Sequence, residues 1–571
     1  MTEVRYAPTT HDLAAPTGPA SDTASAPDYD VVVVGYGPTG MVLAALLGDA
    51  GHRVAVLERY SGLFNLPRAA TFDDETMRLF QKLGVADRIW PDVRPQSTYD
   101  WVNSAGQVLI RNEFTDDGVS GWPQFNMMFQ PLVEGALDER CRHTPGVEIH
   151  YNRRLVGFTQ TGDQVIVSAC QTTGPTAEPV GEPEQLTTRY LVGCDGGNST
   201  VRQGIGTEMD DYGFQEPWLV CDFELKRPVD LPMAMQYGDP VQPISIISIG
   251  PRHHRFSFML ETAVVDPTTV SSDDVWRRVQ AWIQPVDAEL IRVAPYTFRS
   301  TVAQHWRDRR VLIAGDAAHL MPPFLGQGMC SGVRDAHNLA WKLDLALCGR
   351  GGDALLDSYQ VERSPHVRTI VERAVELGRL QTIRDPEAAR IRDQEMLRRR
   401  EAGIRPAAFA FPGYADGFLA AADDEAPDGP GDPLRGGLHP QGRVTDSAGV
   451  LGRFDDVAGA SWVLLARDAE TLGSLDPDLE QAWRSTGGTV VALTSGPATT
   501  NGSATSARAP AGVRLVRDSG RYAELFRDTG RVGVLVRPDR YIYGSAATAK
   551  QLNRLVRQCT EALAVRLVAH R

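Results

Sequence analysis

The segment that decides the fold is residues 29–48, Tyr-Asp-Val-Val-Val-Val-Gly-Tyr-Gly-Pro-Thr-Gly-Met-Val-Leu-Ala-Ala-Leu-Leu-Gly. Its first part is a β-branched apolar run without alternation, which predicts a parallel strand buried on both faces. The Ala- and Leu-rich stretch at 40–50 predicts a helix, and the apolar run at 53–58 predicts a second buried strand. Strand, helix and strand in this order indicate a βαβ unit.

The same region contains 18 consecutive uncharged residues, 31–48, which is the lower limit for a helix that spans a membrane. Gly35, Gly37 and Pro38 lie within it, and a continuous helix through them would be costly. A strand, a tight turn and a helix accommodate every residue. We therefore expect no membrane span.

Residues 35–40 match the pattern G-x-G-x-x-G between the first strand and the helix. The first glycine makes the turn, the second lets a pyrophosphate approach the backbone, and the third allows close strand–helix packing. Glu58 ends the next strand, where its carboxylate can accept hydrogen bonds from a ribose diol. The pattern predicts a dinucleotide site at the helix N-terminus, formed by Gly35, Gly37, Pro38, Thr39, Gly40 and Glu58.

Composition narrows the classes of protein that remain. The chain has 571 residues, several times the roughly 150 of an average domain. Its net charge of −14 disfavours nucleic acid or an anionic membrane as a partner. The seven cysteines are scattered without a C-x-x-C pair, which argues against a disulfide framework, a structural zinc site and a dithiol redox enzyme. The start of the chain lacks the pattern of a secretory signal, so we expect a cytoplasmic protein.

The rest of the chain suggests further units. Residues 218–262 hold strands with the character of an antiparallel sheet that could cover a substrate. A buried strand at 310–314 leads to a long helix near 332–348. A Pro-, Gly- and Asp-rich stretch at 423–442 indicates a linker. The strands and helices after residue 445 suggest a small thioredoxin-like α/β domain, redox-inactive because it lacks C-x-x-C.

Two further segments place Asp-Gly or Gly-Asp at the end of a strand: Tyr-Leu-Val-Gly-Cys-Asp-Gly-Gly-Asn-Ser-Thr-Val-Arg at 190–202, and Arg-Val-Leu-Ile-Ala-Gly-Asp-Ala-Ala-His-Leu-Met-Pro-Pro-Phe-Leu-Gly-Gln-Gly at 310–328. With the first motif, they resemble the FAD-dependent aromatic hydroxylases, and most closely the 3-(3-hydroxyphenyl)propionate hydroxylases. Further similar motifs are Leu-Pro-Arg-Ala at 66–69, Asp-Asp-Glu at 73–75, Gly-Trp-Pro at 121–123, Ser-Gly-Val-Arg-Asp at 331–335, Asn-Leu-Ala-Trp-Lys at 338–342 and Val-Arg-Pro-Asp-Arg at 536–540. The resemblance covers about residues 29 to 545.

This resemblance implies an α/β fold with three parts: a Rossmann-like FAD-binding domain, an inserted mixed β-sheet substrate domain and the C-terminal thioredoxin-like domain. The expected boundaries are 1–28 for a flexible tail; 29–98, 131–217 and 301–422 for the FAD-binding domain with its helical region; 99–130 and 218–300 for the substrate domain; 423–444 for the linker; and 445–571 for the C-terminal domain.

The resemblance also implies roles for individual residues. Asp316 would bind the ribityl hydroxyls of FAD, Gly326 and Gly328 would bring backbone N–H groups to the flavin ring, and Pro322 and Pro323 would lie against its substrate face. Asp195 and Gly196 would serve the flavin and, transiently, the nicotinamide donor. The full set of implied cofactor residues beyond the first motif is Arg59, Arg68, Gln130, Asp195, Gly196, Gly315, Asp316, Gly326, Gly328 and Met329.

One position departs from the family pattern. Cys330 stands where the family usually has Asn, and only a contact from the backbone can be shared by both residues. A reactive thiol is one interpretation, and a small buried hydrophobic side chain is the favoured one.

The chemistry implied is oxygen transfer to a phenol. NAD(P)H would reduce FAD, O2 would add to the flavin C4a position, and the hydroperoxide would hydroxylate a phenylpropionate- or cinnamate-like acid. His254, on the aromatic face of a predicted strand, is the candidate partner of the substrate carboxylate. No metal site is expected. The sequence leaves the oligomeric state open, with a homodimer as one candidate.

Three alternatives remain open from the sequence. The substrate could be an aromatic polyketide-type natural product rather than an acid. The protein could be a flavin-dependent reductase or dehydrogenase. A non-catalytic interaction protein, with the C-terminal domain as its working part, is the least favoured.

Overall fold

The computed structural model describes residues 26–114, 116–262, 270–404, 410–421, 431–494 and 512–564. The expected tail at 1–28 therefore lies almost entirely outside the described residues, and so does part of the expected linker at 423–444. Within the described residues, no helix is both long and apolar enough to cross a membrane.

The first sheet is built around the predicted βαβ unit. Strand β1 (Tyr29–Val34) lies parallel between β2 (Val54–Glu58) and β11 (Glu178–Gly193), and its valines 31–33 are fully buried. The sheet order is β17-β18-β11-β1-β2-β8, with β17 (Arg307–Asp308), β18 (Val311–Ile313) and β8 (Val147–Tyr151) completing it. The antiparallel strands β9 (Arg153–Gln160) and β10 (Val165–Thr173) extend it beside β11.

Helices cover this sheet. Helix α1 (Pro38–Asp49) packs against α7 (Gly328–Leu347) and α4 (Gln130–Arg142). The approach of α1 to α7 is close because a Cβ atom on Gly332 would lie only 2.3 Å from Oγ1 of Thr39. The expected helix near 332–348 thus begins a turn earlier, at Gly328, and α8 (Gly352–Gln381) packs along it.

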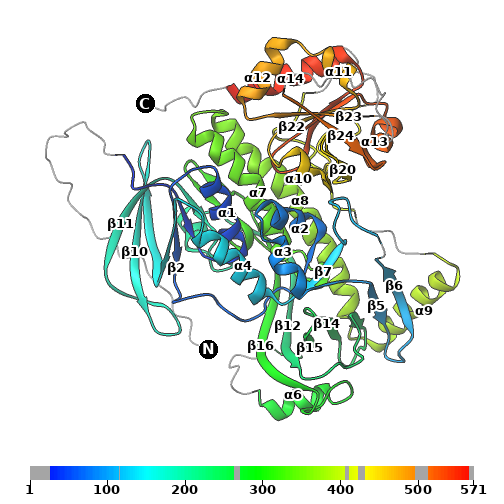
Figure 1. Cartoon of the computed structure of the whole chain (residues 1–571). Helices are drawn as coiled ribbons and strands as arrows, with labels where there is room; N and C mark the ends of the chain where they lie inside the picture. The colour runs from blue at the N-terminus through cyan, green and yellow to red at the C-terminus, as the bar shows by residue number, and fades with distance from the viewer. Residues whose placement is uncertain are drawn as a thin grey trace.

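The middle sheet is predominantly antiparallel, as the sequence predicted. Its order is β19-β16-β12-β15-β14-β13-β5-β6, and only the β13–β5 pair is parallel. The strands are β5 (Thr98–Val102), β6 (Val108–Glu113), β12 (Met209–Leu225), β13 (Ala234–Tyr237), β14 (Ile244–Ser248), β15 (His253–Met259), β16 (Ala288–Ala303) and β19 (His319–Leu320). Helix α9 (Pro386–Glu401) lies against β6 (Figure 1), so this helix borders the middle sheet although it follows α8 in the chain.

The two faces of the middle sheet differ in what they contact. Cross-strand partners share a face, so Trp218, Asp222, Arg255, Arg292 and Tyr296 lie together on what we call the inner face. Trp218 contacts Phe324 of the first domain with ring centroids 6.1 Å apart. The other face, here the outer face, packs its apolar side chains against α6 (Ser272–Val279).

The C-terminal domain has a seven-stranded sheet of order β21-β20-β24-β23-β22-β25-β26. Its core consists of a parallel pair, β22 (Val463–Ala466) and β23 (Thr489–Thr494), followed by the antiparallel β25 (Gly533–Val536) and β26 (Ile542–Ala546) and by α14 (Ala549–Ala564). This is the thioredoxin-like arrangement expected from the sequence. It is extended at one edge by β20 (Arg443–Thr445), β21 (Leu451–Arg453) and β24 (Val513–Asp518).

In Figure 1 the C-terminal domain and the middle sheet lie at opposite ends of the molecule, with α7 and α8 between them. Charged side chains connect α7 and α8 to the C-terminal domain: Glu362 of α8 accepts hydrogen bonds from Lys342 of α7 (2.8 Å) and from Arg537 (2.6 and 2.9 Å). All three side chains are buried, so each charge needs its partners.

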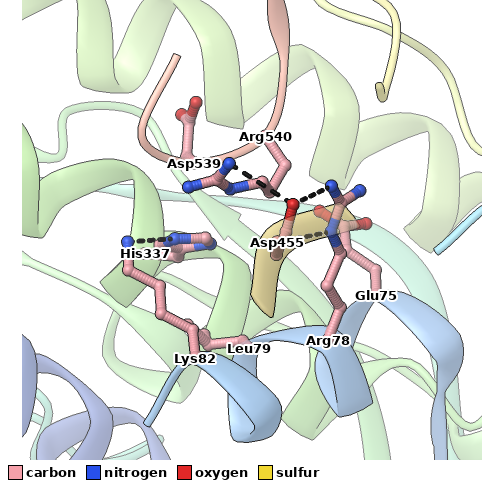
Figure 2. Close-up of a pocket in the computed structure, with 8 residues that line it drawn as sticks. All are labelled: Glu75, Arg78, Leu79, Lys82, His337, Asp455, Asp539 and Arg540. Carbon is pink, nitrogen blue, oxygen red and sulfur yellow. Dashed lines mark hydrogen bonds and ion pairs between the residues drawn. The ribbon is translucent and has the colours of Figure 1, made fainter. Parts of the chain in front are cut away.

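A second buried cluster joins α2 (Asp74–Lys82) to the same domain (Figure 2). Asp455 lies between Arg78, which donates two hydrogen bonds of 2.6 and 2.8 Å, and Arg540 at 3.5 Å. Lys82 donates to Nε2 of His337 over 3.1 Å. The cavity among these side chains is about 10 Å³, room for about one water molecule and not for an aromatic substrate. We therefore assign it to domain packing and not to the active site.

Candidate active site

The first two glycines of the first motif differ in their surroundings. A Cβ atom on Gly35, whose φ is +99°, would lie 2.4 Å from the carbonyl oxygen of Cys194. A Cβ atom on Gly37 would have open space around it: its nearest neighbour would be a guanidinium nitrogen of Arg68, 3.9 Å away. Helix α1 begins at Pro38, and no side chain caps its N-terminus. Open space beside uncapped N–H groups is the environment that a pyrophosphate requires.

Glu58 lies beside this turn at the end of β2. Its carboxylate accepts hydrogen bonds from the backbone N–H of Tyr36 (2.9 Å) and of Tyr60 (3.0 Å). These two bonds fix the carboxylate next to the glycine turn, where a ribose diol would have to lie. The neighbouring Arg59 is exposed, with its guanidinium 5.0 Å from the ring centroid of Tyr60.

Gln130 is the first residue of α4, and its side chain is buried. Its carbonyl oxygen accepts from the backbone N–H groups of Arg68 (2.9 Å) and Ala69 (2.5 Å), and its amide donates to Glu134 (2.6 Å). The Gln130 side chain therefore holds the 68–69 backbone, and the expected direct contact with an FAD phosphate gives way to this indirect role. The Arg68 side chain is half exposed and lies 3.6 Å from Glu134.

Asp195 and Gly196 follow the end of β11. The Asp195 carboxylate accepts from the hydroxyl of Ser199, the N-cap of α5 (Thr200–Gly204), over 2.5 Å and from the backbone N–H of Thr200 over 2.7 Å. Gly196 has a φ of +81° and open space where a side chain would be. In this geometry the backbone of Gly196 is free to meet a ligand, while the Asp195 carboxylate is already occupied.

Asp316 is exposed, and the strand end that carries it is anchored by a buried polar cluster. Asp335 of α7 accepts from the backbone N–H of Gly315 (2.9 Å), from Arg363 (2.8 Å) and from the His319 ring (2.7 Å). Burial opposes ionisation of Asp335, but the charges of His319 and Arg363 hold its pKa at about 2. The cluster leaves the neighbouring Asp316 carboxylate free to face a ligand.

The loop after Asp316 leads to the N-terminus of α7. Pro322 is buried and Pro323 exposed. Gly326 adopts a φ of +65°, and a Cβ atom there would lie 2.4 Å from Cγ2 of Thr71. Gly328 opens α7 with no side-chain cap, and Met329 beside it is partly buried. The uncapped N–H groups at this end can meet a negatively charged flavin edge.

Cys330 lies one turn into α7 and is fully buried. Burial raises the pKa of its thiol to about 12, so the thiolate is not formed near neutral pH. This favours the interpretation of Cys330 as a small apolar residue over that of a reactive thiol.

Comparison with known proteins agrees with this geometry. A family model described as FAD binding domain matches residues 28–374, and one described as HcaD C-terminal domain matches residues 436–562. A protein of Rhodococcus jostii (strain RHA1) named probable NADH-specific resorcinol 4-hydroxylase is 46% identical over 539 residues, which cover 94% of this chain and 95% of the relative. The chain belongs to the FAD-dependent aromatic hydroxylases.

Two further comparisons are informative. The 3-(3-hydroxy-phenyl)propionate/3-hydroxycinnamic acid hydroxylase of Mycobacterium sp. (strain JLS) is 33% identical over 475 residues, covering 81% of this chain and 80% of the relative. The crystal structure of the flavin-dependent monooxygenase PieE in complex with FAD and substrate has a TM-score of 0.74 at 23% identity, covers 94% of this chain and 100% of that chain, and supports the fold alone. The expected family, fold class and FAD cofactor are thus confirmed.

In this hydroxylase, the predicted substrate-facing side of β15 is the wrong one. His254 is buried on the outer face, and its Nε2 atom lies 3.0 Å from the carbonyl oxygen of Pro232. Burial lowers its pKa to about 4, so it carries no charge at neutral pH. The aromatic face that carries His254 packs against α6, and the opposite face meets the FAD-binding domain. The prediction that His254 contacts a substrate carboxylate is therefore wrong.

The inner face carries a residue that the sequence reasoning missed. Tyr296 of β16 is 52% exposed although it lies beside Trp218 on the face turned toward the FAD-binding domain. Loss of hydration and the nearby Asp316 carboxylate raise the pKa of its phenol, so the hydroxyl keeps its proton. Strand periodicity could have found it, because Arg292, Ala294 and Tyr296 alternate along one face.

Proposed function

We propose that this hydroxylase transfers one oxygen atom of O2 to a small uncharged phenol of the resorcinol class, with NADH as reductant. In the overall reaction, the phenol, O2, NADH and a proton give the hydroxylated phenol, NAD⁺ and water. Bound FAD supplies the redox chemistry and the activation of oxygen. The chain contributes binding, orientation and exclusion of water.

The observation that carries the choice of an uncharged substrate is the state of the two inner-face arginines. Arg255 donates to Asp222 (2.6 Å) and to the carbonyl oxygen of Arg68 (2.6 Å), and Arg292 contacts Asp222 and the carbonyl oxygen of Pro67. The Arg255 guanidinium and Nη1 of Arg292 are thus already hydrogen-bonded to protein oxygens. A substrate carboxylate would have to displace these bonds, whereas a phenol hydroxyl needs only a neutral partner.

Tyr296 is the proposed neutral partner. Its protonated hydroxyl can donate to a substrate hydroxyl at the inner face, while Pro322 and Pro323 close the opposite side. The identity of 46% with a relative named for resorcinol and NADH supports the same substrate class and the same reductant. All seven cysteines are free, which supports a reducing, cytoplasmic location. A homodimer stays one candidate for the oligomeric state, which sedimentation would test.

A comparison of substrates tests this proposal. NADH oxidation, O2 consumption and hydroxylated product should be measured with resorcinol and with 3-(3-hydroxyphenyl)propionate. We expect kcat/KM to be at least about tenfold higher for resorcinol, a difference of about 1.4 kcal/mol in transition-state stabilisation. A preference for the acid would contradict the proposed substrate, and O2 consumption without any hydroxylated product would favour the reductase alternative.

Replacing Tyr296 tests whether its hydroxyl binds the substrate or only supports the fold. Tyr296→Phe should raise KM for resorcinol and leave the FAD content unchanged, because the ring remains and only the hydroxyl is lost. The same variant assayed with NADPH in place of NADH tests the reductant separately.

A further inference from the structure

The inner face holds one fully buried carboxylate between two guanidinium groups. Asp222 of β12 is opposite Arg255 of β15 and Arg292 of β16 in the sheet register. Arg255 binds both carboxylate oxygens, at 2.6 and 3.1 Å, and Arg292 approaches one of them at 3.4 Å. Two positive charges and one negative charge leave the cluster with a net charge of +1. A planar guanidinium bound at two points by a carboxylate is strongly oriented.

Both arginines also donate hydrogen bonds to one short segment of the FAD-binding domain. Arg255 donates to the carbonyl oxygens of Arg68 (2.6 Å) and Pro67 (2.9 Å), and Arg292 also donates to that of Pro67. Hydrogen bonds from the middle sheet to its carbonyl groups therefore fix the 67–68 backbone.

The same segment is held from its other side. The Gln130 carbonyl oxygen accepts hydrogen bonds from the backbone N–H groups of Arg68 and Ala69. The middle sheet thus fixes the carbonyl groups of the segment, and α4, which packs against α1, fixes its amide groups. With its backbone fixed in this way, the Arg68 side chain extends to the glycine turn, where its guanidinium is the group nearest to Gly37.

We propose that Asp222 is a positioning residue for the cofactor site: it orients Arg255 and Arg292, which set the 67–68 backbone and so place the Arg68 guanidinium at the dinucleotide turn. Arg68 supplies the positive charge to a phosphate of FAD or of the nicotinamide nucleotide. This inference rests on the proposed cofactor role of the turn and not on the identity of the phenol. It makes the substrate-bearing sheet a structural part of the cofactor site.

A double-mutant cycle between Asp222 and Arg68 tests the proposal. The dissociation constant of FAD is measured from the rise in flavin fluorescence when each holoenzyme is diluted. Asp222→Asn and Arg68→Ala should each raise it by about tenfold. Because Asp222 acts through Arg68, Asp222→Asn should have little further effect in the Arg68→Ala background. Equal effects of Asp222→Asn in both backgrounds would overturn the proposal.

The matched control is Asp100→Asn. Asp100 also forms a two-point pair with an arginine, Arg111, at 2.7 Å for both bonds, and it lies in the same sheet but on β5, away from the cluster. It should leave FAD affinity unchanged. If Asp222→Asn does not fold, Arg292→Lys provides the cycle instead, since lysine keeps the charge but loses the planar fork.

A second readout distinguishes positioning from general stability. If Asp222 only stabilised the fold, its replacement would lower Tm with no change in FAD affinity or in KM for NADH, and the proposal would fail. We expect instead a rise in the FAD dissociation constant at a temperature well below Tm; an additional rise in KM for NADH would show that Arg68 also serves the nicotinamide nucleotide. Because FAD affinity does not depend on the phenol, failure of the proposed substrate would leave this result unaffected.

Discussion

A Cβ atom on Gly40 would lie 2.1 Å from the carbonyl oxygen of Gly35, closer than any side chain tolerates. Gly40 is thus required by the packing of helix against strand, and Gly35 by the close approach of the Cys194 carbonyl after β11, whether or not a ligand is bound. The middle glycine, Gly37, has no such neighbour, and its φ of −89° suits any residue. We therefore expect the open space at Gly37 to serve the approach of a ligand to the backbone.

This contrast predicts different outcomes for two substitutions. Gly37→Val should leave the Tm of the apoprotein nearly unchanged but raise the dissociation constant of FAD at least about tenfold, because the side chain occupies the phosphate position. Gly40→Ala should lower the yield of folded protein before any FAD is added. Thermal denaturation and flavin fluorescence distinguish the two; normal FAD affinity in a folded Gly37→Val variant would refute the phosphate site.

His254→Ala should act on stability and not on substrate charge. The ring is buried on the outer face and bonded to the carbonyl oxygen of Pro232, so its removal should cost about 2–3 kcal/mol of unfolding free energy. KM for an acidic and for an uncharged phenol should change by the same factor. A selective rise for the acid would restore His254 as a carboxylate partner.

Lys82 should make the stability of the folded protein depend on pH, and replacing this one residue should remove that dependence. Burial and the nearby Arg540 charge lower its pKa from 10.5 to about 7 in the folded protein. Above pH 7 the unfolded chain then binds more protons at this residue than the folded chain, so its contribution to stability rises between about pH 7 and pH 10.5 and is lost as pH falls through 7.

The free energy of unfolding of Lys82→Met, relative to that of the wild type, should therefore be highest at pH 6–7. This difference in stability should become smaller as the pH rises to 9. Tm measured across this range for both proteins checks the sign. A difference in Tm that does not vary with pH would show that Lys82 keeps its ordinary pKa.

The thiols of the C-terminal domain should take no part in turnover. Cys559 is the cysteine of that domain, and burial raises the pKa of its thiol. Cys348, which is exposed on the FAD-binding domain, should be the main thiol that reacts with a disulfide reagent in the native protein. Cys348→Ser should abolish this reaction, and Cys559→Ala should retain hydroxylation. Loss of hydroxylation in a folded Cys559→Ala variant would assign a redox role to this domain.

Local pattern was enough to predict the features that are encoded in short segments. The valines of β1, the glycine spacing of the turn and Glu58 at the end of β2 are close in sequence, and their geometry follows from strand, turn and helix propensities. Local pattern also predicted the antiparallel middle sheet, the long helix after residue 328 and the thioredoxin-like order of the last domain. Each of these rests on periodicity within a few dozen residues.

The sequence alone could not decide which face of a strand meets which domain. Alternation in β15 separates His254 from Arg255, but both faces of that strand are buried, so hydrophobicity does not distinguish them. Only the packing of α6 on one side and of the 67–68 backbone on the other assigns His254 to the outer layer and Arg255 to the inner face. The tertiary structure likewise turned Gln130 from an expected phosphate ligand into a support for Arg68, because hydrogen bonds between residues 62 positions apart leave no local trace in the sequence.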